Sequence, residues 1–166
     1  GLDAEKIARG MHSFESSANV VPGRFNQFQH KGATVIADYG HNPDAMRALA
    51  SAIEAMKPKK SHVVISGAGD RRDEDIRDLT RILGNSFDNV ILYQDQCQRG
   101  REDGEVLKLL QEGLVGTKKA KQVKEITGEF LAIDTALNDL STGDICLILI
   151  DQVEESLAYL KEKVQP

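Results

Sequence analysis

The sequence predicts an α/β protein: a Rossmann-like, three-layer domain with a mainly parallel sheet of about six strands, an antiparallel edge hairpin and helices on both faces. Strand-like segments alternate with amphipathic helical segments along most of the chain, as right-handed crossovers between parallel strands require. The segment 145–150 is apolar at every position, as expected of a strand buried on both sides. The length of 166 residues suits one such domain, which needs no disulfide or metal to be stable.

The first expected element is a helix at 2–14, because Ile7, Met11 and Phe14 share one helical face. A polar segment and then Pro22 follow, and this composition is typical of a linker. We therefore expect residues 1–21 to be a helix and linker attached to a domain that covers residues 22–166.

The alternating residues 25–29, a turn at 30–32 and a more apolar strand at 33–38 predict the edge hairpin. After the hairpin, helices and strands take turns along the chain. The expected helices are 43–56, 73–83, 104–114, 128–140 and 153–164, and the expected strands are 62–66, 89–93, 122–126 and 144–150.

The charge balance excludes several classes of partner. Lys and Arg number 21 against 26 Asp and Glu, which gives a net charge of −5 and no general attraction for nucleic acid or an anionic membrane. No apolar run approaches the ~20 residues that cross a bilayer, so the cytoplasm is the expected location. Cys97 and Cys146 lie far apart without zinc-ligand spacing, and neither a disulfide nor a metal site is expected.

Ligands of open parallel sheets bind beyond the carboxyl ends of the strands, so the loops after the strands are the candidate sites. In the loop 38–44, the carboxylate of Asp38 could accept hydrogen bonds from a ribose diol, and His41 could contact a base, sugar or phosphate. Asn42, Pro43 and Asp44 fit the start of a helix better than they fit a ligand.

The loop 66–75 is a near miss to the dinucleotide motif G-x-G-x-x-G, because Gly67 and Gly69 are present but Arg72 replaces the third glycine. Asp70 precedes two adjacent arginines, Arg71 and Arg72, which suit a carboxylate or phosphate. A compact turn with solvated charges explains the same residues equally well.

The polar loop 94–104 is long enough to carry binding residues. It contains Asp95, and its Arg99 and Arg101 could recognise a carboxylate. Arg24 lies between the linker and the first strand and could reach a phosphate across a domain boundary. Taken alone, however, Arg24 is more simply explained as a surface residue.

Several catalytic motifs are missing from the sequence. It contains no G-x-x-x-x-G-K-[ST] phosphate loop and no recognisable Ser-His-Asp, Cys-His or metal-ligand arrangement. The chain is therefore not expected to be a self-contained catalyst.

Taken together, the segments 23–25, 38–45, 67–72 and 99–101 resemble the C-terminal domain of the Mur ligase family over nearly the whole chain. Within that family, three segments resemble the C-terminal part of the cyanophycin synthetases most: 22–26, 69–77 and 110–113.

The resemblance implies an ATP-dependent amide ligase, which phosphorylates a carboxylate and lets an amine attack the acyl phosphate. In cyanophycin synthetases the amine is that of arginine, and the carboxylate belongs to a poly-aspartate backbone. ATP and Mg²⁺ would be held mainly by a preceding central ATPase domain, whose last helix and linker would be residues 1–21. The partners would be that domain, a small amino acid and an acidic acceptor, and the domain alone would be inactive.

The resemblance also implies roles for particular residues. It assigns Arg24 to the ATP phosphates and Asp38 to the ribose, with His41 and Asn42 on the nucleotide side. The residues expected to face the incoming amino acid are Gly67, Asp70, Arg71, Arg72, Asp95, Arg99 and Arg101. No metal ligand and no catalytic residue is assigned to this domain.

Other functions stay open. The segment 95–99 departs from the acidic run expected in cyanophycin synthetases, which leaves another Mur-type amino-acid ligase as an alternative. A free-standing nucleotide- or dinucleotide-binding module would use the turn at 67–69. A degenerate scaffold would retain only the fold and a partner surface.

Overall fold

The computed structural model describes residues 21–94 and 98–164. The helix expected at 2–14, together with Asp95 and Cys97, lies outside these residues.

Every strand and helix expected after the linker is present, with bounds that differ by up to three residues from those expected. The strands are β1 (Asn26–His30), β2 (Ala33–Asp38), β3 (Ser61–Ile65), β4 (Asn89–Gln94), β5 (Gln122–Thr127) and β6 (Ile145–Leu149). The helices are α2 (Pro43–Ala55), α3 (Asp73–Ser86), α4 (Glu105–Leu114), α5 (Glu129–Asp139) and α6 (Val153–Lys163).

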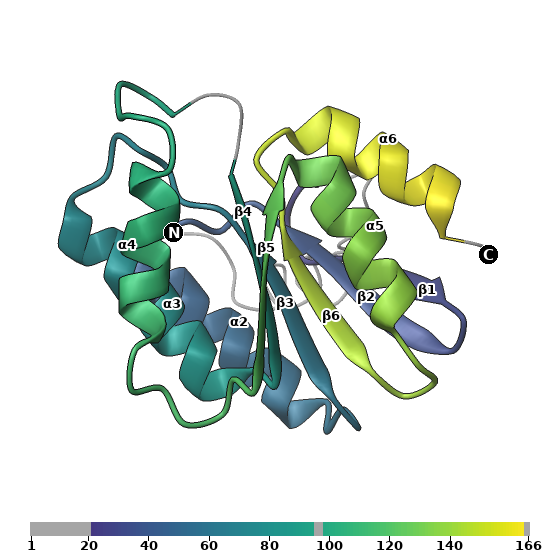
Figure 1. Ribbon diagram of the computed structural model, residues 1–166. Coiled ribbons are helices and arrows are strands. Elements are labelled where there is room, and N and C mark those ends of the chain that lie inside the picture. Colours follow the sequence, from purple (N-terminus) through teal and green to yellow (C-terminus); the bar gives the residue numbers. More distant parts are fainter. Residues whose placement is uncertain (1–20, 95–97, 165–166) are drawn as a thin grey trace, which may run out of the picture.

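The strands form one six-stranded sheet in the order β1-β2-β6-β3-β4-β5. The hairpin pair β1 and β2 is antiparallel, and the remaining neighbours are parallel. Helices α2, α3 and α4 cover one face of the sheet, whereas α5 and α6 cover the other (Figure 1). The expected three-layer α/β class is confirmed.

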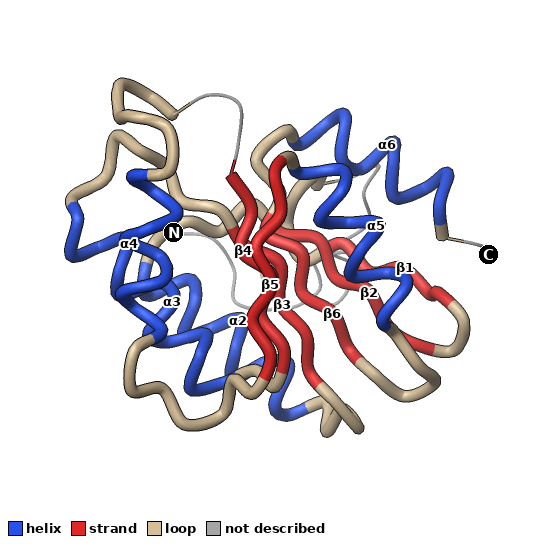
Figure 2. Tube along the Cα trace, in the orientation of Figure 1, coloured by secondary structure: helices blue, strands red, loops and turns tan. Residues whose placement is uncertain are grey.

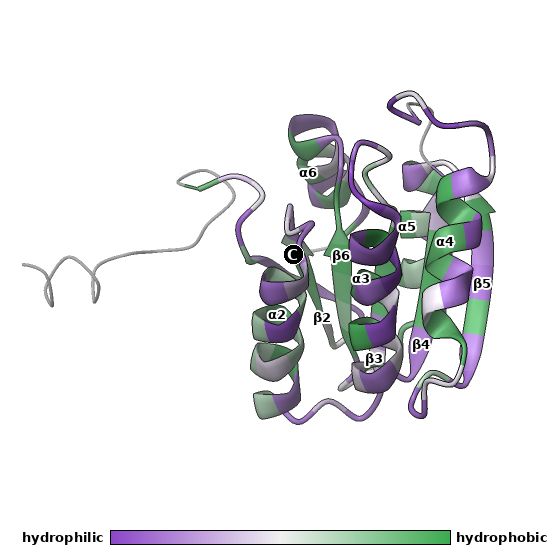
Figure 3. Cartoon of the chain, turned by 90° about the vertical axis from the view of Figure 1, so that its left-hand side faces the viewer, coloured by the Kyte–Doolittle hydropathy of each residue, from purple (hydrophilic) through white to green (hydrophobic). Residues whose placement is uncertain are grey.

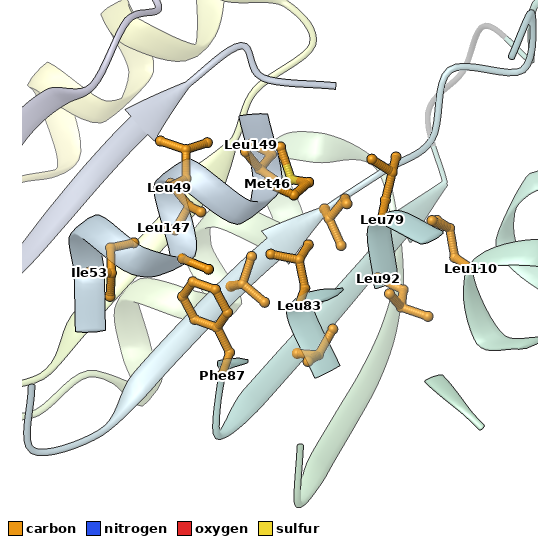
Figure 4. Packing of buried hydrophobic residues seen from close by; sticks show 14 of the residues in the cluster. Met46, Leu49, Ile53, Leu79, Leu83, Phe87, Leu92, Leu110, Leu147 and Leu149 are labelled. Atoms are coloured by element: carbon orange, nitrogen blue, oxygen red, sulfur yellow. The ribbon is translucent and has the colours of Figure 1, made fainter. Parts of the chain in front are cut away.

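The core consists of two apolar layers, one on each face of the sheet. On the first face, Met46, Leu49 and Phe87 pack with Leu147 of β6 (Figure 4). The neighbouring Cys146 of β6 belongs to the layer beneath α5 and α6. Because successive β6 side chains alternate between the two layers, the strand is apolar throughout.

The edge strand β5 is covered less than the central strands. From Val123 onward it alternates exposed and half-buried residues, and Val123 itself is exposed. Hydrophilic and hydrophobic residues both occur along this strand (Figure 3). The neighbouring charges Lys124 and Glu125 discourage pairing with a further strand. Across the described segments, none of the helices is both long and apolar enough to traverse a bilayer.

Strand β6 marks the switch point of the sheet. Its neighbours β2 and β3 lead into α2 and α3 on one face, but β6 leads into α6 on the opposite face. Where the connections after neighbouring strands leave toward opposite faces of the sheet, a crevice opens beyond the carboxyl ends of those strands. The loops after β2, β3 and β6 therefore meet where such folds bind ligands (Figure 2).

Candidate functional site

A pocket of about 310 Å³ lies beyond the end of β2 and beside the first turns of α2. We call it the β2 pocket. Arg24, Asp38, His41 and Asn42 all line it, although Arg24 belongs to the segment before the hairpin. The structure thus brings together the four residues that the sequence analysis associated with ATP, because β1 returns antiparallel beside β2.

The carboxylate of Asp38 has a structural task within this pocket. It is 8% exposed, and its two oxygens accept hydrogen bonds from the backbone N–H groups of Phe25 at 2.8 Å and Gly40 at 2.6 Å. Each carboxylate oxygen can accept more than one hydrogen bond, so both keep the capacity to accept from a ligand hydroxyl. The ligand role of Asp38 stays a prediction, and sequence reasoning missed its backbone contacts.

Aromatic and cationic side chains gather around Tyr39, which contributes to two pockets. The Arg24 guanidinium carbon lies 5.9 Å from the centre of the Tyr39 ring, within cation–π range. The His41 ring meets the same ring edge-on at 4.9 Å, and its Nδ1 is 2.9 Å from the Tyr39 carbonyl oxygen. Sequence reasoning did not select Tyr39, although a ring directly after a buried strand was a usable signal.

Asn42 caps α2, as the helix-start interpretation predicted. Its side-chain oxygen accepts a hydrogen bond of 2.9 Å from the backbone N–H of Ala45, and Pro43 follows at the first helical position. The side-chain amide nitrogen of Asn42 keeps two N–H donors that the cap does not use.

A second, small pocket of about 30 Å³ lies at the switch point, and we call it the switch pocket. Tyr93 closes one side by donating a hydrogen bond of 3.1 Å to the Leu149 carbonyl. The lining comes from the ends of four parallel strands: Tyr39, Gly40, His41, Ser66, Gly67, Ala68, Tyr93, Leu149, Ile150 and Asp151. His41 and Tyr39 therefore lie between the switch pocket and the β2 pocket.

Arg99 connects the loops around the switch pocket. Its guanidinium donates to Asp151 Oδ1 at 3.0 Å and lies 3.6 Å from Asp70 Oδ1. Burial opposes its charge, but a hydrogen bond with Tyr39 and the two carboxylates outweigh burial and raise the pKa of Arg99. Sequence reasoning missed Asp151, although this carboxylate follows the most apolar strand much as Asp38 ends β2.

Arg101 is directed into the protein. Its guanidinium donates to the carbonyls of Gly69 and Arg71, each at 2.7 Å, and to Asp73 at 2.8 Å and Glu105 at 2.6 Å. The side chain is only 16% exposed. Arg101 therefore joins the loop after β3 to the loop after β4.

The two glycines of the near-miss motif serve close packing. A Cβ on Gly69 would lie 2.1 Å from the Gln98 carbonyl oxygen, and one on Gly67 would lie 2.8 Å from Val106 Cγ1. Distances below 3 Å force the neighbours to move, so only glycine fits at either position. Packing against α4 at Gly67 and against the loop after β4 at Gly69 thus accounts for both glycines without a phosphate ligand.

The remaining residues of this loop are more open to solvent. Arg72 forms two hydrogen bonds with Asp75, at 2.9 and 2.8 Å, on the surface of α3. Asp70 and Arg71 are exposed, and within the described segments the Arg71 side chain has no hydrogen bond or ion pair. Arg71 is thus the cation of this loop that can turn toward a ligand.

No group of three or more His, Cys, Asp or Glu side chains in residues 21–94 and 98–164 is arranged to hold a metal ion.

Comparison with known proteins identifies relatives along nearly all of the chain. A cyanophycin synthetase from Geminocystis herdmanii is 36% identical over 162 residues, which cover 98% of this chain and 18% of that protein. A UDP-N-acetylmuramoyl-L-alanyl-D-glutamate–2,6-diaminopimelate ligase from Bradyrhizobium diazoefficiens is 31% identical over 152 residues, covering 89% of this chain and 28% of the relative.

A solved structure shares the fold. It is a bifunctional folylpolyglutamate synthase/dihydrofolate synthase with Mn, AMPPNP and L-glutamate bound, and it matches with a TM-score of 0.71 at 22% identity. The match covers 97% of this chain and 36% of that one. The family described as Mur ligase, glutamate ligase domain, matches residues 23–149, and the chain accordingly belongs to the Mur ligase family.

Proposed function

We propose that this chain is the C-terminal, ATP- and amino-acid-contacting domain of an amide ligase that works through an acyl phosphate. We further propose the cyanophycin-synthetase reaction, in which arginine is joined to the side-chain carboxylate of a poly-aspartate. The observation that carries the proposal is the convergence of Arg24, Asp38, His41 and Asn42 on one pocket. The chain spans only 18% of the cyanophycin synthetase it matches, so activity would require the rest of such a ligase.

The β2 pocket has donors and acceptors suited to a nucleotide. The remaining acceptor capacity of Asp38 suits the two hydroxyls of a ribose. Arg24 is exposed beside the pocket, where its guanidinium could pair with phosphate oxygens of ATP held by a central domain. Mg²⁺ would neutralise phosphate charge and would be held mainly by that other domain.

The reaction would proceed in two steps. The acceptor carboxylate attacks the γ-phosphorus of ATP, and ADP leaves as an acyl phosphate forms. The amine of the incoming amino acid then attacks the carbonyl carbon, phosphate leaves, and the nitrogen loses a proton to give the amide. Closure of this domain over the other would exclude the water that otherwise hydrolyses the acyl phosphate.

Arginine as the incoming amino acid fits the charges around the switch pocket. Arginine carries a carboxylate at one end and a guanidinium at the other. Arg99 and Arg71 supply cations for a carboxylate, whereas Asp70 and Asp151 supply anions for a guanidinium. Arg101 would act by holding the two loops together, and Gly67 by letting the loop after β3 pack closely against α4.

The test is to assay the complete ligase for ATP-dependent joining of arginine to a poly-aspartate acceptor. Removing the Arg24 guanidinium with Arg24→Ala should lower kcat/KM for ATP by about tenfold to a hundredfold, as expected for a charge-assisted hydrogen bond. Arg81→Ala, an exposed arginine of α3, is the matched control and should change nothing. Normal turnover in both Arg24→Ala and Asp38→Ala would refute the proposal.

A different amino-acid ligase is the second candidate, supported by the 31% identity to a diaminopimelate ligase. Offering the complete ligase arginine, lysine, diaminopimelate and glutamate in turn decides between the two. Preference for diaminopimelate would replace the arginine assignment while leaving the ATP site in place. A free-standing dinucleotide-binding module would instead require the isolated chain to bind NAD in a titration, which the packing role of Gly67 and Gly69 argues against.

A further inference from the structure

A buried carboxylate lies next to the switch pocket and belongs to none of the expected site residues. Glu129, the first residue of α5, is 2% exposed. It accepts hydrogen bonds from the Ser156 hydroxyl at 2.6 Å and from the backbone N–H groups of Asp151 at 3.1 Å and Gln152 at 3.2 Å. Hydrogen bonds to this carboxylate thus link the start of α5 to the turn that joins β6 to α6.

This contact completes the start of α6. The N-cap residue Gln152 makes no side-chain cap of its own, and Glu129 accepts from the backbone N–H groups of Gln152 and Asp151, directly before the first turn of the helix. Burial raises the pKa of Glu129, while the three hydrogen bonds favour the charged form. Burying a carboxylate costs free energy unless it is well hydrogen-bonded. Here all three hydrogen-bond donors come from the segment 151–156, so the buried carboxylate holds that segment in place.

That segment carries a residue of the switch pocket. The end of β6 is fixed by a hydrogen bond from Ile150 N–H to the Asp38 carbonyl at 3.0 Å and by the contact of Tyr93 with Leu149. Beyond Ile150, the backbone at Asp151 is held by Glu129. The side chain of Asp151 then bonds to Arg99 at 3.0 Å.

We propose that Glu129 is a positioning residue for the amino-acid site: it fixes the turn at 151–152 and so orients Asp151, which in turn orients Arg99. The proposal rests on the proposed role of Arg99 in binding the incoming amino acid. It predicts that a change at Glu129 weakens amino-acid binding and leaves ATP binding intact, because the ATP pocket has separate anchors in Asp38 and Asn42.

The test is Glu129→Gln in the complete ligase. Glutamine keeps the size of the side chain but replaces one carboxylate oxygen, an acceptor, with an NH₂ group, which can only donate. At least one N–H or O–H donor that now bonds to Glu129 would then lose its acceptor. We expect KM for the amino acid to rise about tenfold and KM for ATP to change by less than about twofold. Glu155→Gln, an exposed position in the first turn of α6, is the matched control and should leave both constants unchanged.

A mutant cycle separates positioning from general loosening of the fold. If Glu129 acts through Asp151 and Arg99, adding Glu129→Gln to a background that carries Asp151→Ala and Arg99→Ala should raise the amino-acid KM by less than about twofold more. Additive effects, or equal rises in both KM values, would overturn the proposal. If Glu129→Gln does not fold, Ser156→Ala removes one donor to the same carboxylate, and it should raise only the amino-acid KM.

Amino-acid binding is also measured by calorimetry with the complete protein and an unreactive ATP analogue. If the wild-type ligase binds arginine but does not join it to an acceptor, the proposed function is refuted. The role of Glu129 is then still tested by comparing the arginine affinities of wild type and Glu129→Gln. A wild-type protein that binds no amino acid would overturn both proposals.

Discussion

The carboxylate of Asp38 accepts a hydrogen bond of 2.8 Å from the backbone N–H of Phe25, across the start of the edge hairpin. Phe25 has a φ of 50°, in the left-handed region that a residue with a side chain seldom adopts. Asp38 therefore holds an unfavourable backbone conformation directly after Arg24. One side chain supports the shape of the β2 pocket and also lines it.

Replacing Asp38 with asparagine should destabilise the chain. The amide nitrogen of Asp38→Asn would face the N–H of Phe25 or Gly40, so one buried donor would lose its acceptor. We expect the free energy of unfolding to fall by about 1–3 kcal/mol in urea denaturation. Asp44→Asn, an exposed carboxylate in the first turn of α2, is the control and should cost less than about 1 kcal/mol. Equal stability of Asp38→Asn and wild type would show that these contacts contribute nothing.

Gly69→Ala should separate the loops after β3 and β4. The new methyl group would lie 2.1 Å from the Gln98 carbonyl oxygen, a distance that backbone movement alone can relieve. Overpacking of this kind costs about 1–3 kcal/mol, which urea denaturation detects. An unchanged denaturation midpoint would mean that the two loops do not approach each other as described.

Arg101→Lys should destabilise the same pair of loops. A lysine ammonium is a single point and cannot reach the two carbonyls and two carboxylates that the guanidinium contacts. The expected loss is about 1–2 kcal/mol, since two of the partners are exposed carboxylates and solvent screens them. Arg72→Lys changes an exposed arginine in the neighbouring loop and should leave the thermal midpoint where it is. If both variants melt alike, Arg101 does not join the loops.

His62 should make stability depend on pH. Burial lowers the pKa of His62 below its ordinary value of about 6.5, although Asp144, 3.5 Å away, opposes this. The unfolded chain then binds a proton at His62 more readily than the folded chain does. The stability that depends on a neutral His62 is therefore fully present above about pH 6.5 and decreases as the pH falls below that value.

The measurement is urea denaturation of wild type and His62→Gln between pH 5 and 8, a range of about 1.5 pH units on each side of an ordinary histidine pKa. The stability of wild type relative to the variant should decrease as the pH falls from about 6.5. Taking the difference removes contributions from other groups, including His30, whose pKa burial also lowers. A difference that stays constant with pH would contradict the prediction.

The local pattern of the sequence was enough to predict the elements. Apolar stripes such as Leu49 and Ile53 on α2, the continuous apolar run of β6 and the alternation in the hairpin are properties of neighbouring residues. They specify which residues are buried without reference to the rest of the chain. For the same reason the cap at Asn42 was predicted from the residues next to it.

The partners of the loops depended on the tertiary structure. Insertion of β6 between β2 and β3 brings Asp151 to Arg99 and Glu129 to the start of α6, over separations of 52 and 22 residues. No local pattern contains this information, because the order of parallel strands is set by how crossover helices pack on the two faces. The sequence by itself determined the strands, the helices and the polar loops, and only the folded sheet decided which of their charges meet.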